Sequence, residues 1–264
     1  MMQATCVDTH VLYKHDLSHG YFALTLAGYP RAGECRPGQF LHVRLPGSEV
    51  FFRRPMSVAG VNGDRGEIDI IFKVLGRGTR LMSALHDGDP VNLLGPLGKP
   101  FRPPDDGSTV VMVAGGVGFP PLLFLAEWLV QGGWDPARIE FLYGGRSTGD
   151  ILCRDRIRAL GVRFHPTTED GSLGRRGLVT EPLEDLIRER GAAGLFVYGC
   201  GPEPMLKAVN DLGIARRLRG ELSLEAPMPC GIGVCLGCVV PRTNGEHARV
   251  CLEGPVFDIG EIAL

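Results

Sequence analysis

The chain has 264 residues, 44% of them hydrophobic and 22% charged, and a formal net charge of −2. This composition is typical of a globular protein whose core needs no disulfides, and its small charge favours neither nucleic acid nor an anionic membrane as a partner. No apolar stretch reaches the ~18 residues of a membrane span, and no charged start precedes an apolar run, so we expect a cytoplasmic protein without a signal peptide.

The first part of the chain, residues 1–103, is predicted to form an antiparallel β domain, as a small barrel or a sandwich. It contains short strand-like runs separated by Gly, Pro and Asp clusters, at 21–26, 39–45, 67–74 and 90–98. Even spacing with turn signals of this kind is typical of a small all-β domain. One helix is predicted inside it, over 79–87.

A Pro-rich charged segment, 102–109, separates this part from one with a different pattern. Residues 104–220 alternate strand-like and helix-like stretches, which predicts a doubly wound parallel sheet. The expected strands are 109–116, 138–145, 162–168 and 194–201, and the expected helices are 120–131, 150–160, 179–190 and 202–211. Residues 221–264 are predicted to be a small third domain with a cysteine-rich loop and short strands.

Two short motifs in the first domain suggest a phosphate site. In "RRPMSV" (53–58), an Arg on a strand would bind a phosphate, and a Ser nearby would present its hydroxyl to a ring. In "GRGT" (76–79), a Gly-rich turn opens into a helix, where free N–H groups attract anions. Arg54 and this helix start would together hold a pyrophosphate. A surface Arg beside an edge-strand Pro would give the first motif equally well.

Two further motifs lie at strand ends of the predicted sheet, where ligands bind in such folds. In "VAGGVGFPP" (113–121), a buried strand runs into glycines and then directly into a helix. Its spacing from Gly116 is G-x-G-x-x-P, which departs from the Rossmann fingerprint, so a tight turn without ligand remains an alternative. The second motif, "YGCGP" (198–202), places Cys200 near a bound nucleotide or buries it as a small core residue.

Half of the eight cysteines lie near the C-terminus, with the spacing C-x4-C-x2-C followed by one more. This is the plant-type ferredoxin spacing for a [2Fe–2S] cluster, and the interspersed glycines let backbone N–H groups approach sulfur. Zinc remains an alternative, although structural zinc sites usually have two C-x2-C pairs and only one is present. Disulfides are not expected in a cytosolic chain. The cluster interpretation assigns four metal ligands, Cys230, Cys235, Cys238 and Cys251.

In this order, the motifs resemble the ferredoxin–NADP reductase superfamily, which combines a flavin barrel with a pyridine-nucleotide domain. They are most similar to the electron-transfer subunits of type B, NAD-linked dihydroorotate dehydrogenases. That similarity rests on "RRPMS", "TEDGSLGRRGLVT" (168–180), "YGCGPEPMLKAV" and "SLEAPMPCGIGVCLGCVV". The stretch "EAPMPCG" departs from the family pattern, because a basic residue after Glu225 and a small one before Cys230 would be expected.

The resemblance implies a function, cofactors and site residues. Electrons would pass between a partner FMN-containing dihydroorotate dehydrogenase subunit and NAD, in preference to NADP, through [2Fe–2S] and FAD, in a heterotetramer serving pyrimidine biosynthesis. Ser57 and Cys200 would be catalytic. The cofactor-binding residues would be Arg54, Pro55, Met56, Ser57, Ile71, Phe72, Lys73, Gly78, Thr79, Gly115, Gly116, Gly118, Gly199 and Gly201.

Two alternatives remain at this point. The same architecture would serve an NAD(P)H-dependent ferredoxin or sulfur reductase subunit, since the barrel, nucleotide and cluster motifs are shared. A zinc-bound interaction module with a vestigial nucleotide site is the non-enzyme alternative. Flavin and cluster absorption would distinguish it from both enzymes.

Overall fold

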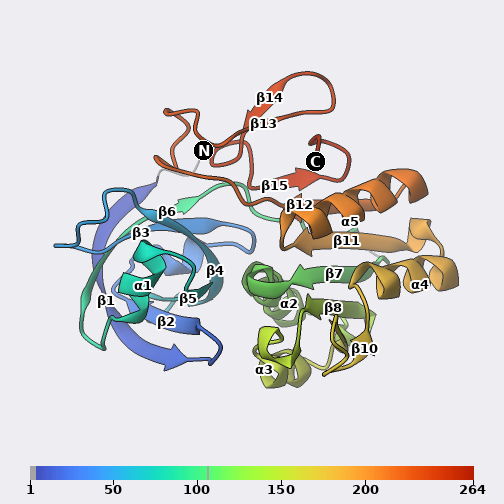
Figure 1. Cartoon of the computed structure of the whole chain (residues 1–264), viewed down its shortest axis with the longest axis horizontal. Coiled ribbons are helices and arrows are strands. Elements are labelled where there is room, and N and C mark those ends of the chain that lie inside the picture. Colours follow the sequence, from blue (N-terminus) through green and yellow to red (C-terminus); the bar gives the residue numbers. More distant parts are fainter. Residues whose placement is uncertain (1–3, 106) are drawn as a thin grey trace.

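A computed structural model describes residues 4–105 and 107–264. A closed β barrel lies beside a seven-stranded sheet flanked by helices, and the C-terminal segment, orange to red, runs along the upper edge of both (Figure 1). In the described part of the chain, no helix combines the length and the apolar character needed to traverse a bilayer.

The barrel has the strand order β1-β2-β5-β4-β3-β6, with every neighbouring pair antiparallel. Its strands are β1 (Thr5–Asp16), β2 (Tyr21–Ala27), β3 (Phe40–Arg44), β4 (Arg54–Asn62), β5 (Glu67–Lys73) and β6 (Pro90–Leu97). The apolar positions that alternate along these strands fill the interior, with Leu24, Val43 and Ile70 fully or almost fully buried. The predicted barrel is therefore confirmed.

Two details of the barrel differ from the sequence expectation. Strand β1 was not expected, because charged and polar residues on its outer face interrupt the apolar pattern and few of its residues are buried. The expected helix over 79–87 is α1 (Arg77–Ser83), which begins two residues earlier because Thr79 caps its start. Its hydroxyl oxygen accepts hydrogen bonds from the N–H groups of Leu75 and Gly76, at 3.0 and 3.1 Å.

The sheet has the order β10-β9-β8-β7-β11-β12-β15, parallel except for its last strand. Its strands are β7 (Thr109–Gly115), β8 (Ile139–Gly145), β9 (Arg163–Thr168), β10 (Arg175–Arg176), β11 (Leu195–Cys200), β12 (Arg219–Ser223) and β15 (Val256–Asp258). Its helices are α2 (Phe119–Gln131), α3 (Arg154–Ala159), α4 (Thr180–Arg190) and α5 (Glu203–Arg216). Short 3-10 turns occupy Ala32–Glu34, Gly116–Gly118, Pro136–Arg138, Thr148–Asp150 and Ala192–Gly194.

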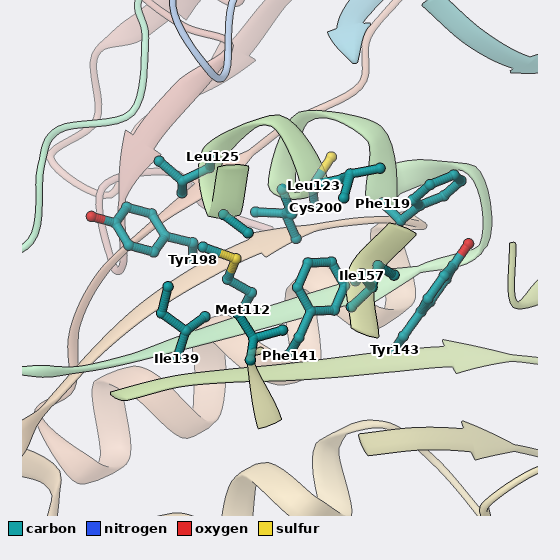
Figure 2. Close-up of a cluster of buried hydrophobic side chains, with 14 of the residues drawn as sticks. Met112, Phe119, Leu123, Leu125, Ile139, Phe141, Tyr143, Ile157, Tyr198 and Cys200 are labelled. Atoms are coloured by element: carbon teal, nitrogen blue, oxygen red, sulfur yellow. The ribbon is translucent and has the colours of Figure 1, made fainter. Parts of the chain in front are cut away.

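The core of this domain lies on both faces of the central strands, as a parallel sheet requires. Met112, Phe141 and Tyr198 occupy neighbouring register positions on β7, β8 and β11, so they share one face beneath α2 (Figure 2). Val111 and Val197 face the opposite side, toward α4 and α5. This arrangement confirms the predicted doubly wound sheet.

Two helix predictions need correction at their ends. The helix expected over 150–160 begins only at Arg154, because Cys153 has a positive φ of 50° and interrupts the helical backbone before it. The helix expected over 202–211 continues to Arg216, where Arg217 at φ 56° ends it.

The C-terminal segment shares its core with the sheet. Strand β15 pairs antiparallel with β12, and Phe257 and Val250 join the hydrophobic cluster that contains Leu222. A two-stranded hairpin, β13 (Val239–Pro241) and β14 (His247–Arg249), extends from it. The predicted boundary between residues 220 and 221 falls within β12, and the three domain ranges remain predictions.

Candidate functional site

A cavity of about 240 Å³ lies between the barrel and the carboxyl ends of the sheet strands. Its walls come from three parts of the chain: the barrel, the strand ends of the nucleotide domain, and the segment that leads into the cysteine loop. Nine predicted site residues line it, namely Pro55, Met56, Ser57, Ile71, Phe72, Lys73, Thr79, Gly118 and Cys200. The structure therefore brings the "RRPMSV" motif of the barrel and the two strand-end motifs of the sheet to one site.

Arg54 lies against the first turn of α1. A methyl group on Gly78 would come within 2.8 Å of the Arg54 Cδ atom, so the glycine makes room for this side chain. The guanidinium donates one hydrogen bond to the carbonyl of Phe52, at 2.8 Å. Its Nε is buried without a partner among the described residues. An unpaired buried donor of this kind fits an anionic group such as a phosphate.

Lys73 joins the cavity wall to the nucleotide domain. Its ammonium donates to the Tyr21 hydroxyl at 3.0 Å and to Asp150 at 3.2 Å, and the Tyr21 hydroxyl donates to the same carboxylate at 2.8 Å. Burial opposes ionisation of Asp150, but these two hydrogen bonds outweigh it and lower the pKa of the carboxyl. The triad fixes the barrel against the turn that precedes α3.

The glycine-rich turn after β7 fits closely against the end of β11. Gly116 has φ 50°, which favours glycine, and a methyl group on Gly118 would overlap the Cys200 carbonyl oxygen. Gly201 and Gly115 also approach one another, since a methyl group on Gly201 would lie 3.0 Å from the Gly115 Cα. Gly115, Gly116 and Gly201 thus shape this turn, while Gly199 lies within β11 against Leu222; among these predicted glycines, Gly118 lines the cavity.

Cys200 lies at the end of β11, 4% exposed. Burial raises the pKa of its thiol to about 12, so it stays protonated at physiological pH. Glu225 also lines the cavity, and its charge acts on the same thiol. Desolvation raises the pKa of this carboxyl as well. Sequence reasoning did not assign Glu225, although it stands in the "SLEAPMPCG" stretch that carried the resemblance.

The four predicted metal ligands meet in two pairs. The Sγ atoms of Cys238 and Cys251 are 3.2 Å apart, and the Cys230 sulfur interacts with the Cys235 side chain. Across the described residues, no three Cys, His, Asp or Glu side chains converge on a single metal-ion position. A tetrahedral zinc would need all four sulfurs within about 3.8 Å of one another. Two pairs fit a binuclear cluster better, because each iron of a [2Fe–2S] centre takes two ligands.

The loop also supplies N–H groups to sulfur. Although burial opposes it, backbone N–H groups of Ile232, Cys235 and Val234 help to lower the pKa of the Cys230 thiol to about 6. The N–H of Gly237 donates to the Cys235 sulfur at 3.4 Å. Such donors stabilise negative charge on sulfur, as an iron–sulfur cluster requires. All eight cysteines lie in the described residues, and none is joined to another by a disulfide.

Two family models match this chain. Residues 225–263 match the iron–sulfur cluster binding domain of dihydroorotate dehydrogenase B, and residues 112–211 match an oxidoreductase NAD-binding domain. The chain is also 36% identical over 260 residues to the protein of Shouchella clausii named dihydroorotate dehydrogenase B (NAD(+)), electron transfer subunit. That similarity covers 96% of each chain.

The chain belongs to this electron transfer subunit family. A second member, from Lysinibacillus sphaericus, is 38% identical over 262 residues, which cover 96% of this chain and 97% of the relative. Membership of the family agrees with the expectation from the motifs. The matched iron–sulfur domain contains all four predicted cysteine ligands.

Solved structures confirm the fold of the whole chain. An NADH-dependent reduced ferredoxin–NADP oxidoreductase, described for flavin-based electron bifurcation, matches with a TM-score of 0.85 and 28% identity, over 97% of this chain and 89% of that one. A ferredoxin NADP+ reductase from Neisseria gonorrhoeae with bound FAD and NADP matches with a TM-score of 0.68 and 19% identity, over 80% of this chain and 91% of that one. The second likeness concerns the fold alone.

Proposed function

We propose that this chain is the electron-transfer subunit of an NAD-linked dihydroorotate dehydrogenase. A partner subunit would oxidise dihydroorotate, and this chain would carry the electrons from that partner to NAD+. The reaction would belong to pyrimidine biosynthesis and take place in the cytoplasm. The observation that carries the proposal is the composition of the cavity walls. Barrel residues such as Ser57, strand-end residues such as Cys200, and Met228 from the approach to the cysteine loop all line the same cavity.

This shared cavity supports an order of cofactors. Bound FAD would exchange two electrons with NAD and single electrons with the cluster. The chain's own residues position these groups. Arg54 and the start of α1 would hold the pyrophosphate of FAD, while Ser57 and the β5 residues would line its ring. The turn Gly115–Gly118 and Gly199–Gly201 would hold NAD, with the neutral Cys200 thiol at the nicotinamide.

The partner surface is proposed to surround the cysteine loop. Ile232, Val234 and Leu236 lie between the ligands of this loop, and they are 49%, 72% and 61% exposed. Apolar side chains grouped at the metal site are typical of a surface that another subunit covers. We propose that an FMN-containing catalytic subunit binds there and that two copies of each chain form a heterotetramer.

The direct test is purification of the tagged chain from its own cells, with mass spectrometry of bound proteins and assays of flavin, iron and sulfide. We expect a flavoprotein with dihydroorotate dehydrogenase activity to co-purify, together with one FAD and two irons for each chain. A preparation with zinc and no flavin would overturn the proposal. NADH and NADPH should be compared as reductants, because exposed Arg146 directly follows the end of β8 and could meet a 2′-phosphate.

A second candidate function is reduction of ferredoxin by NAD(P)H. The similarity to the NADH-dependent reduced ferredoxin–NADP oxidoreductase, over 97% of this chain, favours it specifically. The two functions predict different partners. NADH-dependent ferredoxin reduction by the isolated chain, with no co-purifying dihydroorotate dehydrogenase, would decide for this second function.

A further inference from the structure

His42 lies beneath the loop that carries the proposed cluster ligands. It belongs to β3 of the barrel, and its side chain is fully buried. A methyl group on Gly231 would lie 2.6 to 2.8 Å from three atoms of the imidazole ring. Gly231 directly follows Cys230, so the imidazole forms the floor under the start of the loop.

The imidazole has polar atoms without partners. Both ring nitrogens are buried and make no hydrogen bond within the described residues. An unpaired buried polar group is costly, and a bound group that pairs with it is one physical reason for its presence. Burial, then the charges of Arg53 and Arg54, lower the pKa of His42 to about 4. In either protonation state the imidazole carries at least one N–H that can donate a hydrogen bond.

The same strand leads to the cavity. The Phe40 ring lies 5.7 Å from the His42 ring, and Phe40 pairs with Ser57 in the barrel register and lines the cavity wall. His42 therefore stands between the cavity and the cysteine loop. An N–H at this position can act on the loop without contacting the proposed flavin site.

We propose that His42 is a positioning residue for the iron–sulfur cluster, with its ring supporting Gly231 and its N–H donating a hydrogen bond to a sulfur of the bound cluster. The proposal rests on the proposed function, which places a [2Fe–2S] cluster on the four cysteines. Hydrogen bonds to cluster sulfurs favour the more negative, reduced state. His42 therefore raises the reduction potential of the cluster.

The test is the midpoint potential of the cluster, measured anaerobically on the full-length chain by spectroelectrochemistry, with the EPR signal of the reduced cluster. We expect His42→Phe, which keeps a ring and removes the N–H, to shift the potential to more negative values and to alter the EPR signal. His42→Gln, which keeps a donor, should restore part of the shift. Tyr29→Phe removes another unpartnered buried polar atom from the same barrel and should change neither.

Each result separates this inference from the proposed function. Wild-type protein without a cluster would overturn the function itself. Wild-type potentials in both His42 variants, or equal shifts in both, would overturn the role of the N–H while leaving the function intact. If His42→Phe loses the cluster, the Gln variant decides: a cluster of near wild-type potential supports the proposal, and loss of the cluster there too overturns it.

Discussion

The Sγ atoms of Cys238 and Cys251 lie 3.2 Å apart in a buried position, and the N–H of Cys251 faces the Cys238 sulfur at 3.5 Å. The strands of the β13–β14 hairpin, which lies between the two cysteines in sequence, bring them together. Cys230 and Cys235 form the second pair on the more exposed side of the loop. The two pairs give the loop a buried side toward the sheet and an exposed side toward solvent.

We expect Cys235→Ser to lose the cluster and electron transfer to the partner while keeping reduction of a dye by NADH. The reason is that Cys235 does not line the cavity where the nucleotide and flavin motifs meet. Iron content, visible absorption and the rate of dye reduction measure the two effects. Cys6→Ser, an exposed thiol on β1, is the matched control and should keep iron. Loss of flavin reduction by NADH in Cys235→Ser would contradict the proposed order of cofactors.

Arg54→Ala is expected to weaken FAD binding by about tenfold to a hundredfold, because it removes charge-assisted hydrogen bonds to a phosphate. Flavin retained after dialysis, measured by absorbance, reports the loss. Arg65→Ala removes an exposed guanidinium, paired with Glu67, beyond the opposite end of β4, and should retain flavin. Full occupancy in the Arg54 variant would show that this side chain does not hold the cofactor.

Gly118→Ala should raise the dissociation constant for NADH by about tenfold or more, because a loss of ~1.4 kcal/mol in binding free energy corresponds to a tenfold change. Flavin and iron content should stay unchanged. The added methyl group would overlap the Cys200 carbonyl oxygen and push the end of β7 away from β11. Stopped-flow reduction at several NADH concentrations measures the change. Gly194→Ala, where a methyl group meets nothing within 4 Å, is the control. Unaltered NADH binding in Gly118→Ala would place the nucleotide elsewhere.

Glu140 links stability to pH. This carboxylate on β8 is 1% exposed and contacts Arg163 at 3.0 Å, His165 at 2.7 Å and Arg190 at 2.7 Å. Burial opposes ionisation, but these partners prevail and hold the pKa of Glu140 below its usual 4.5. Near and below pH 4.5, the folded state therefore binds fewer protons at this carboxyl than the unfolded state does. The stabilisation is fully present above about pH 4.5 and is lost as the pH falls further.

Glu140→Gln should therefore lower the free energy of unfolding by about 2 kcal/mol at pH 7, because Arg163, Arg190 and His165 lose their carboxylate partner. The difference from the wild type should shrink as the pH falls below about 4.5. Urea unfolding at pH 7 and pH 4 provides the measurement. Glu184→Gln, an exposed position on α4, should change little at either pH. If the difference in unfolding free energy between wild type and Glu140→Gln increased toward acid pH, the inferred lowering of the Glu140 pKa in the folded state would be wrong.

The sequence by itself indicated the family, a barrel followed by a doubly wound sheet, and nine of the residues that line the cavity. The "RRPMS", "GGVGFPP", "YGCGP" and C-x4-C-x2-C motifs are local, and their chemistry depends on neighbours within a few residues. The barrel and the doubly wound sheet follow from apolar periodicity in the same way. The outer face of β1 escaped prediction because its charged residues break that periodicity.

Only the tertiary structure decided which distant residues meet. Contacts between segments far apart in the chain bring Glu225 to the wall that Cys200 lines, pair Cys238 with Cys251, and pack His42 under Gly231. No local pattern encodes them, because each depends on where the barrel, the sheet and the returning strand β15 pack against one another. The packing of the whole core sets the positions of these residues. The cavity and the cysteine loop therefore become neighbours only in the folded chain.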